Sequence, residues 1–125
     1  MDVETGTLIA GDLVFNDRAP TTPDARITDW LVSLDALGGL GAARIVPGHG
    51  PVDPAGASVA QTRDYLTWLD ARLRDAAARG RSMVEVMEEP IPPRFDEMGA
   101  LPEEYHRSVS HLYADIEREL LPLAD

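Results

Sequence analysis

Two short apolar segments flank an amphipathic helix in the first half of the sequence, and this order restricts the fold more than any other feature. The run "TGTLIAGD", residues 5–12, is bounded by glycines and predicts a buried strand that ends at Gly11 and Asp12. Residues 42–46 form a second short apolar segment, which Pro47 ends. Because a strand, a helix and a second strand joined by a short return loop are typical of an α/β layer, the sequence predicts the α/β class.

The helix between these two segments is predicted from the spacing of its apolar residues. They recur at steps of three and four and form a single stripe: Ile27, Trp30, Leu31, Leu34 and Leu37. Thr22 and Pro23 have the pattern of an N-cap followed by a proline at the first helical position, so we expect the helix to begin there. We expect it to end at Gly38 and Gly39.

A long amphipathic helix is predicted in the second half of the sequence. Apolar residues step by three and four from Ala55 to about Arg79, and charged residues occupy the other faces. Three residues of the apolar face are expected to be buried against the stripe of the preceding helix or against the final helix: Leu66, Leu69 and Leu73. Ser82 and Glu85 have the spacing of a capping box, which predicts a short helix through Glu88.

A proline-rich segment precedes the last helix. Residues 89–102, "EPIPPRFDEMGALP", contain four prolines and are predicted to be irregular, which makes them a candidate lid over a substrate. The final helix is expected to begin near Pro102, and its apolar face contains Tyr105, Val109, Leu112, Tyr113, Ile116 and Leu120. We therefore expect residues 1–54 to form a strand-helix-strand segment and residues 55–125 to form a helical C-terminal extension of the same domain.

Composition limits the size and the partners of this fold. The 125 residues, 44% of them hydrophobic, are enough for one globular domain, and the absence of cysteine excludes both disulfides and a thiolate zinc site. A net charge of −11 repels nucleic acid and anionic lipid, so neither nucleic acid nor a membrane is an expected partner. No apolar run reaches the roughly 18 residues of a membrane span, and no basic region precedes the first run, so we expect a soluble, cytoplasmic protein.

Two side chains with metal-binding chemistry follow the predicted strands. Asp12 ends the first strand, and His49 lies just past the second, in "PGHG". Open α/β sheets place functional groups at such strand ends, and Gly48 and Gly50 let the backbone turn sharply around the imidazole. A carboxylate with a neutral imidazole suits zinc, or manganese or iron. Two plainer interpretations stay open, namely Asp12 as a loop cap and His49 as an ordinary turn residue.

The segments "LIAGDLVFN", "ITDWLVSLDAL" and "RIVPGHGPV" together resemble the C-terminal half of the metallo-β-lactamase superfamily, particularly its glyoxalase II-like hydrolases. The resemblance covers about residues 5–54 and implies half of an αββα sandwich with an extended helical tail. In that family the aspartate of the "GD" motif bridges two metal ions and the histidine of "PGHG" ligates the second. The resemblance therefore implies that Asp12 and His49 are ligands of zinc, with a second metal ion possible, in a centre that hydrolyses a small-molecule substrate.

The sequence departs from the family at the other metal ligands. The His-x-His-x-Asp-His run and a further histidine ligand have no counterpart. His106 and His111 are five residues apart on the final predicted helix, about 140° round its axis, so they cannot face one metal ion. The resemblance thus implies a C-terminal portion of a hydrolase that is inactive alone and holds zinc weakly or not at all. Its expected partner is the missing N-terminal half or a second copy of the chain.

Two other functions stay open at this point. A decayed, non-catalytic relative would use the acidic helical tail to bind a protein partner, whereas a complete small metalloprotein would use Asp12, His49 and an acidic neighbour such as Asp53. If the chain is a portion of a hydrolase, its strands should present an unpaired edge or an apolar face where the other half packs. Because such a surface must be covered, we then expect a dimer or a strand-swapped oligomer.

Overall fold

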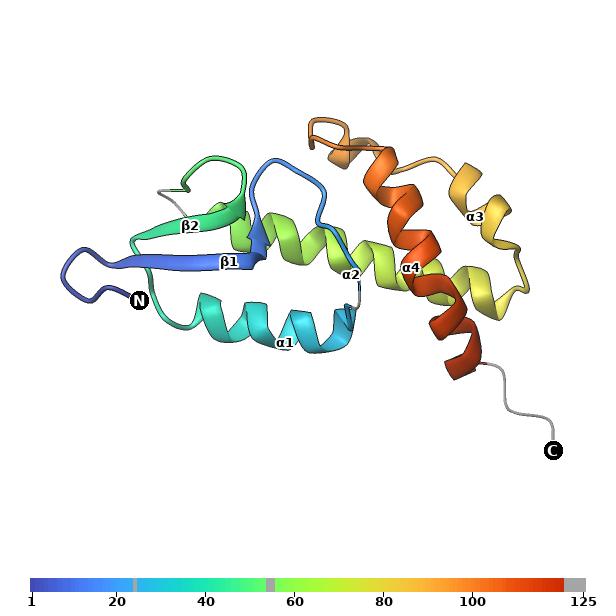
Figure 1. Ribbon diagram of the computed structural model, residues 1–125, viewed down its shortest axis with the longest axis horizontal. Helices are drawn as coiled ribbons and strands as arrows, with labels where there is room; N and C mark the ends of the chain where they lie inside the picture. Colours follow the sequence, from blue (N-terminus) through green and yellow to red (C-terminus); the bar gives the residue numbers. More distant parts are fainter. Residues whose placement is uncertain (24, 54–55, 121–125) are drawn as a thin grey trace.

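The computed structural model describes residues 1–23, 25–53 and 56–120, in which a small parallel sheet is combined with four α-helices (Figure 1). The elements in chain order are β1 (Thr7–Phe15), α1 (Ile27–Gly38), β2 (Arg44–His49), α2 (Ala57–Ala78), α3 (Met83–Glu88), the 3₁₀ helix η1 (Pro93–Phe95) and α4 (Glu103–Leu120). The sheet and α1 lie at one end of the molecule, α3 and α4 lie at the other, and α2 runs between them (Figure 1). The predicted α/β class is confirmed, as are the four helices expected within the described residues.

β1 and β2 pair in parallel because α1 carries the chain back to the start of the sheet. Leu8 lies opposite Ile45 and both side chains are buried, whereas Ile9, the next residue along β1, is 78% exposed. This alternation means that one face of the sheet is packed and the other is open. α1 and α2 both contact β1 and each other, so they supply the packing. The described residues form only these two strands, and Ile9 provides the exposed apolar group expected on an uncovered sheet.

The first strand extends further than the sequence predicts. β1 does not end at Asp12 but continues to Phe15. The backbone N–H of Phe15 donates to the hydroxyl of Thr62 at 3.1 Å, and Thr62 lies on α2, 47 residues further along the chain. The predicted end was wrong because a contact so distant in sequence leaves no mark on the local pattern of the strand.

The second strand is also displaced from its predicted position. It begins at Arg44 rather than Ala42, and it passes through Pro47 to end at His49. Proline usually interrupts a ladder because it lacks the backbone N–H that a neighbouring strand needs. Here the register between the strands shifts on both sides of the Gly11–Pro47 pair, so the missing donor interrupts no regular run of hydrogen bonds. His49 is therefore the last residue of the strand, not a residue beyond it.

The start of α1 differs from the prediction, whereas its end agrees. α1 begins at Ile27, and its N-cap, Arg26, makes no side-chain capping bond. The hydroxyl of Thr22, the predicted cap, is fully buried and donates instead to the hydroxyl of Ser108 on α4 at 2.8 Å. Thr22 thus joins two distant segments and cannot cap the helix. At the other end α1 stops at Gly38, as expected.

α2 forms the shared core of the molecule. Its residues Leu66, Leu69 and Leu73 are fully buried, as predicted. α2 contacts β1 and α1 at one end of the molecule and α4 at the other, so these leucines belong to a core that both parts share. The described helix begins at Ala57, and the predicted start at Ala55 lies outside the described residues. No helix in the described ranges is both long enough and apolar enough to cross a membrane.

The proline-rich segment is irregular apart from η1, as predicted. It is nevertheless fixed in place, because Phe95 and Met98 are buried. The Gly99 N–H donates to the Asp17 carbonyl at 2.8 Å, and the Ala19 N–H donates to the Gly99 carbonyl at 3.0 Å. These bonds connect the segment to the chain that follows β1.

α3 begins with the predicted capping box. The Ser82 hydroxyl accepts the Glu85 N–H at 3.2 Å, and the Glu85 carboxylate accepts the Ser82 N–H at 3.0 Å. These hydrogen bonds to Ser82 hold the pKa of the Glu85 carboxyl below its ordinary value. Val86, on the same helix, is fully buried in the core.

Replacing Ser82 with alanine is expected to lower the free energy of unfolding by about 0.5–2 kcal/mol, because the backbone N–H of Glu85 loses its acceptor, the Ser82 hydroxyl. Urea denaturation followed by circular dichroism measures the change. Ser110→Ala is the matched control, since Ser110 is exposed within α4 and caps no helix. An equal loss in the two variants would contradict a capping role for Ser82.

Candidate functional site

Asp12 and His49, the two side chains chosen from the sequence, lie next to each other in the structure. The Asp12 Oδ1 atom is 3.8 Å from the His49 Nε2 atom. The two residues belong to neighbouring parallel strands, close to the end where both strands finish. Both side chains are accessible, with exposed fractions of 80% for Asp12 and 36% for His49. A carboxylate and an imidazole therefore meet at one point that solvent can reach.

Asp12 lies within β1 rather than at its end, in a stretch that bulges out of the ladder. Gly11 pairs with Pro47, and Phe15 pairs with His49. The segment of β1 between these two pairs is therefore longer than the matching segment of β2. Extra residues bend the longer strand and re-aim its side chains. The bulge is the reason that Asp12 is exposed in the middle of a strand.

Two helices hold this bulge from the packed side of the sheet. The indole N–H of Trp30 on α1 donates to the Leu13 carbonyl at 2.8 Å. The Thr62 hydroxyl on α2 accepts the Phe15 N–H at 3.1 Å and lies 2.9 Å from the Phe15 carbonyl oxygen. Because each residue of the bulge segment from Leu13 to Phe15 is fixed or buried, the position of Asp12 is set by its neighbours.

Both glycines of "PGHG" are required by the close approach of the two strand ends. A Cβ atom at Gly48 would lie 2.3 Å from Asp12 Oδ1 and 2.7 Å from the backbone of Gly11. At Gly50 a Cβ atom would lie 2.0 Å from the Asn16 carbonyl oxygen, and the φ angle of +94° disfavours any side chain. The predicted sharp turn therefore applies to Gly50, whereas Gly48 makes room for Asp12.

The His49 imidazole is positioned by an aromatic neighbour. Its ring stacks on Phe15 with a centroid separation of 4.9 Å and an interplanar angle of 28°. The Asn16 N–H donates to the His49 carbonyl at 3.0 Å, which fixes the backbone of the same residue. Sequence reasoning missed Phe15, because its pairing with His49 depends on the bulge and no local spacing marks it.

An open hollow of about 490 Å³ begins at Asp12. Leu13 and Trp30 supply apolar walls, and Arg26 and Asp29 at the start of α1 supply charges of both signs. This volume is within the range of pockets that hold small organic molecules. The Asp12 carboxylate thus borders a space that a small molecule can enter.

Asp12 and His49 fit a metal ion as two of its ligands. Two ligand atoms at zinc–ligand distances of about 2.0–2.1 Å and a tetrahedral angle lie about 3.3 Å apart, so a small side-chain rotation from the observed separation suffices. Within the described ranges, no group of three or more histidine, aspartate or glutamate side chains is placed to hold a metal ion. Asp53, the third ligand considered from the sequence, accepts the Ser58 N–H at 2.6 Å and thereby holds the start of α2.

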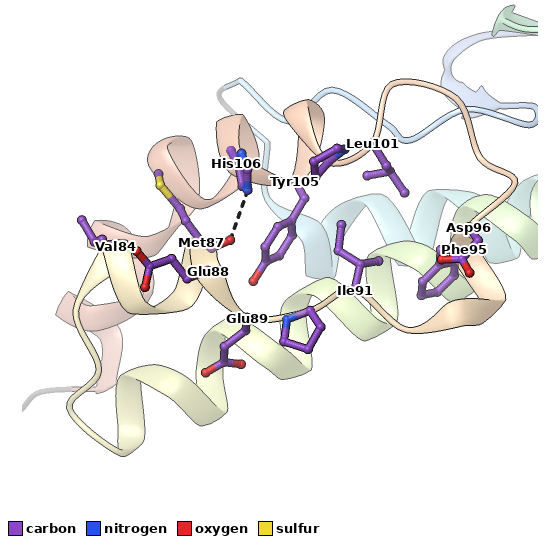
Figure 2. Close-up of a pocket in the computed structure, with 12 residues that line it drawn as sticks. Val84, Met87, Glu88, Glu89, Ile91, Phe95, Asp96, Leu101, Tyr105 and His106 are labelled. Carbon is purple, nitrogen blue, oxygen red and sulfur yellow. Dashed lines mark hydrogen bonds between the residues drawn. The ribbon is translucent and has the colours of Figure 1, made fainter.

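The other two histidines belong to a different part of the fold, on α4. His106 Nε2 lies 3.1 Å from the Met87 carbonyl oxygen, so this nitrogen carries a proton. His106 also lines a second cavity, of about 740 Å³, between α3, residues 89–102 and the start of α4 (Figure 2). This cavity is larger than the hollow at Asp12. The sequence indicated only that residues 89–102, which form part of its lining, are a candidate lid over a substrate.

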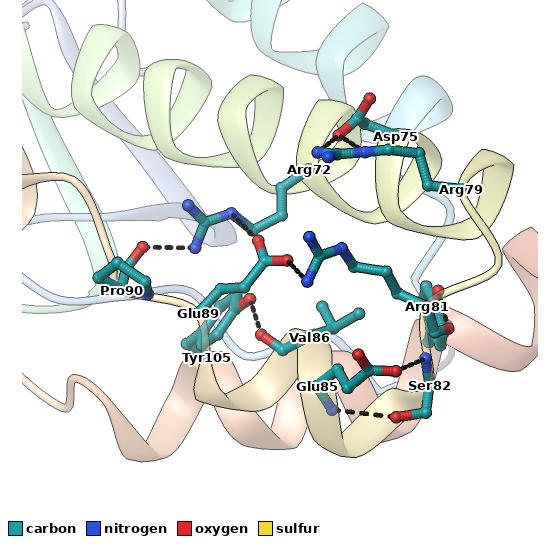
Figure 3. A network of polar contacts seen from close by, with 11 residues as sticks. Arg72, Asp75, Arg79, Arg81, Ser82, Glu85, Val86, Glu89, Pro90 and Tyr105 are labelled. Atoms are coloured by element: carbon teal, nitrogen blue, oxygen red, sulfur yellow. Dashed lines mark hydrogen bonds and ion pairs between the residues drawn. The ribbon is translucent and has the colours of Figure 1, made fainter.

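A polar network lies beside this second cavity and connects α2, α3 and α4 (Figure 3). The Glu89 carboxylate is 3.6 Å from Arg72 Nε and 3.3 Å from Arg81 Nη1. The Tyr105 hydroxyl donates to the Val86 carbonyl at 2.6 Å. Burial raises the pKa of Tyr105, so its hydroxyl keeps the proton that it donates. The network fixes one wall of the cavity.

No protein-family model matches this chain, and a search of curated proteins found no match either. The metallo-β-lactamase resemblance therefore depends on the motif residues and their order alone. A function for the chain has to be inferred from the geometry at Asp12 and His49.

Proposed function

We propose that this chain contributes Asp12 and His49 to the metal centre of a zinc-dependent hydrolase of the metallo-β-lactamase type, as the C-terminal half of its αββα sandwich. The observation that carries the proposal is the 3.8 Å separation of Asp12 Oδ1 from His49 Nε2 at neighbouring parallel strands. The order of the segments supports it as well, because "GD" lies within β1, "PGHG" lies at the end of β2, and one helix connects the two strands.

The two side chains would hold the metal in different ways. The carboxylate of Asp12 has two oxygen atoms and can bridge two ions, whereas His49 can offer one nitrogen while its ring stays stacked on Phe15. When bound, zinc lowers the pKa of a coordinated water to about 7 and so supplies a hydroxide nucleophile at neutral pH. The chain's own contribution is to aim both ligands through the bulge and the Phe15 contact.

The remaining ligands would come from a second polypeptide surface. A catalytic zinc ion takes about three ligands from protein, and this sequence lacks the His-x-His-x-Asp-His run that would provide them. Ile9, 78% exposed, lies on the same strand as Asp12 and would be covered by the added surface. That surface would belong to the N-terminal half of the sandwich or to a second copy of this chain.

The substrate would be a small molecule that enters the hollow beside Asp12. The candidate substrates are esters, thioesters, lactams and phosphodiesters, because bound zinc would support the hydrolysis of all four classes. Arg26 places a positive charge at the hollow, and Asp29 places a negative charge there. Specificity would then depend on Leu13 and Trp30, whose side chains form its apolar walls.

Zinc titration of the isolated chain by calorimetry tests the ligand assignment. Two ligands should provide about half of the roughly 10–16 kcal/mol of a four-ligand site, so we expect a dissociation constant between about 1 μM and 0.2 mM. Asp12→Ala and His49→Ala should each abolish measurable binding. The isolated chain should hydrolyse neither thioesters nor lactams, because the centre is incomplete.

Two matched variants control for general effects of charge and of histidine. Asp96→Ala and His111→Ala remove the same chemical groups elsewhere, and both should bind zinc like the unaltered chain. Stoichiometric zinc retained through dialysis would instead indicate a self-sufficient site. Unchanged affinity in the Asp12 and His49 variants would contradict the proposal and favour the non-catalytic acidic interaction module.

A further inference from the structure

The cavity of about 740 Å³ at the helical end of the molecule has the size and shape of a ligand site of its own (Figure 2). It is an open pocket between α3, the proline-rich segment and the first turn of α4. Pockets of about 300–1,000 Å³ typically bury most of a small organic ligand. The cavity shares no lining residue with the hollow at Asp12, so it is a separate site.

Most side chains that line the cavity are apolar. Phe95 and Tyr105 are buried side chains that line it, and Ile91 lies between them in the close view (Figure 2). Behind them Trp68 contacts both rings, with centroid separations of 5.3 Å to Phe95 and 5.5 Å to Tyr105. Phe95 and Tyr105 are buried beneath the lining, so a ligand with an apolar body would meet the partly exposed side chains of Met87, Ile91 and Leu101.

The charges at the cavity have one sign. Three carboxylates line it, and its lining contains no lysine or arginine. Arg72 and Arg81 pair with Glu89, which leaves Glu88 and Asp96 without an ion-pair partner among the described residues. Glu88 and Asp96 lie toward opposite ends of the cavity (Figure 2). An apolar chamber with an uncompensated carboxylate at each end attracts a cation and repels an anion.

The buried rings beneath the lining already contact cations of the protein itself. The Arg94 guanidinium lies 4.5 Å from the centre of the Phe95 ring, and that of Arg72 lies 5.8 Å from the centre of the Tyr105 ring. These contacts show that cations already rest on both rings from outside the cavity. Because both rings are buried, the attraction for a positively charged ligand comes from the carboxylates of the cavity.

We propose that this cavity binds an organic amine whose apolar body packs on Met87, Ile91 and Leu101 and whose ammonium group pairs with Glu88 or Asp96. The apolar lining would bind the apolar body of the amine, and an unpaired carboxylate would bind its ammonium group. This binding activity is independent of the proposed metal centre, because none of these residues contacts Asp12 or His49.

Three probes with one apolar body and different charges test the proposal on the unaltered chain. Phenylbutylamine, phenylbutanol and phenylbutyrate are titrated in turn and followed by NMR. We expect the amine to bind about three- to tenfold more tightly than the alcohol, and the anionic acid to bind more weakly than either. The resonances that shift should be those of the Met87, Ile91 and Leu101 methyl groups.

Charge variants separate the carboxylates of the cavity from the overall acidity of the protein. A Glu88→Gln, Asp96→Asn double variant should bind the amine and the alcohol equally. The matched control, Glu4→Gln with Asp75→Asn, removes the same net charge outside both the cavity and the hollow at Asp12 and should keep the preference. The two single variants show which end holds the ammonium.

A substitution that fills the cavity with a larger side chain provides the remaining test. Ile91→Trp should abolish binding of both the amine and the alcohol, and circular dichroism checks that this variant is folded. The proposal would be overturned by equal binding of amine and alcohol in the unaltered chain. It would also be overturned by shifts that map outside the cavity, or by a control variant that loses the preference as the double variant does.

Discussion

Replacing Gly50 with alanine is expected to destabilise the protein by about 2–5 kcal/mol, because strain in the backbone and a steric clash add together. The φ angle of Gly50 is +94°, and a Cβ atom there would lie 2.0 Å from the Asn16 carbonyl oxygen. The chain cannot relieve the clash without separating the ends of β1 and β2. Urea denaturation measures the loss, and hydrogen exchange of the Asn16 amide, which donates to His49, should become faster.

Gly38→Ala is the matched control for this substitution. Gly38 is the last residue of α1, and a Cβ atom there would meet nothing within 4 Å. Alanine at a compatible position restricts the unfolded chain, so this variant should gain about 0.4–1 kcal/mol. If Gly50→Ala were as well tolerated as Gly38→Ala, the close approach of the strand ends would be contradicted, and with it the positioning of Asp12 beside His49.

The helices could be predicted from the sequence because their signals are local. The apolar stripes of α2 and α4 recur at helical spacing, and the capping box of Ser82 and Glu85 places the start of α3. The start of α1 could not be predicted, since the hydroxyl of Thr22 bonds to Ser108, 86 residues away. A capping pattern in the sequence shows only that a side chain can form the capping hydrogen bond. Which hydrogen bond the side chain forms depends on the tertiary fold.

The candidate site could be predicted in part. Asp12 and His49 were identifiable because each follows an apolar run, and the fold brings these runs together as neighbouring strands. The bulge in β1 was not predictable, because it depends on the pairing of Phe15 with His49 and on the hydrogen bond from the Trp30 indole to the Leu13 carbonyl. For the same reason the sequence did not identify the aromatic ring on which the imidazole stacks.

Truncating Leu69 to alanine is expected to lower the free energy of unfolding by about 2–5 kcal/mol, because the lost side chain leaves a cavity in a tightly packed core. Leu69 is fully buried on α2, the helix that contacts β1, α1 and α4. Leu69→Met keeps the volume and should cost less than about 1.5 kcal/mol. Val32→Ala, at a position on α1 that is 68% exposed, should change the free energy by less than about 0.5 kcal/mol.

The Leu69→Ala variant also tests whether the strand-helix-strand segment and the helical tail are one domain. Trp30 reports on the first part and Trp68 on α2, so the Trp30→Phe and Trp68→Phe variants each leave one fluorescent probe. Because α2 gives its buried leucines to both parts, both probes should follow one unfolding transition, and Leu69→Ala should shift both midpoints equally. A shift seen by Trp68 alone would mean that the sheet and α1 keep a core of their own without α2. In that case the position of Asp12 and His49 would not depend on the tail, and the two parts would be separate domains.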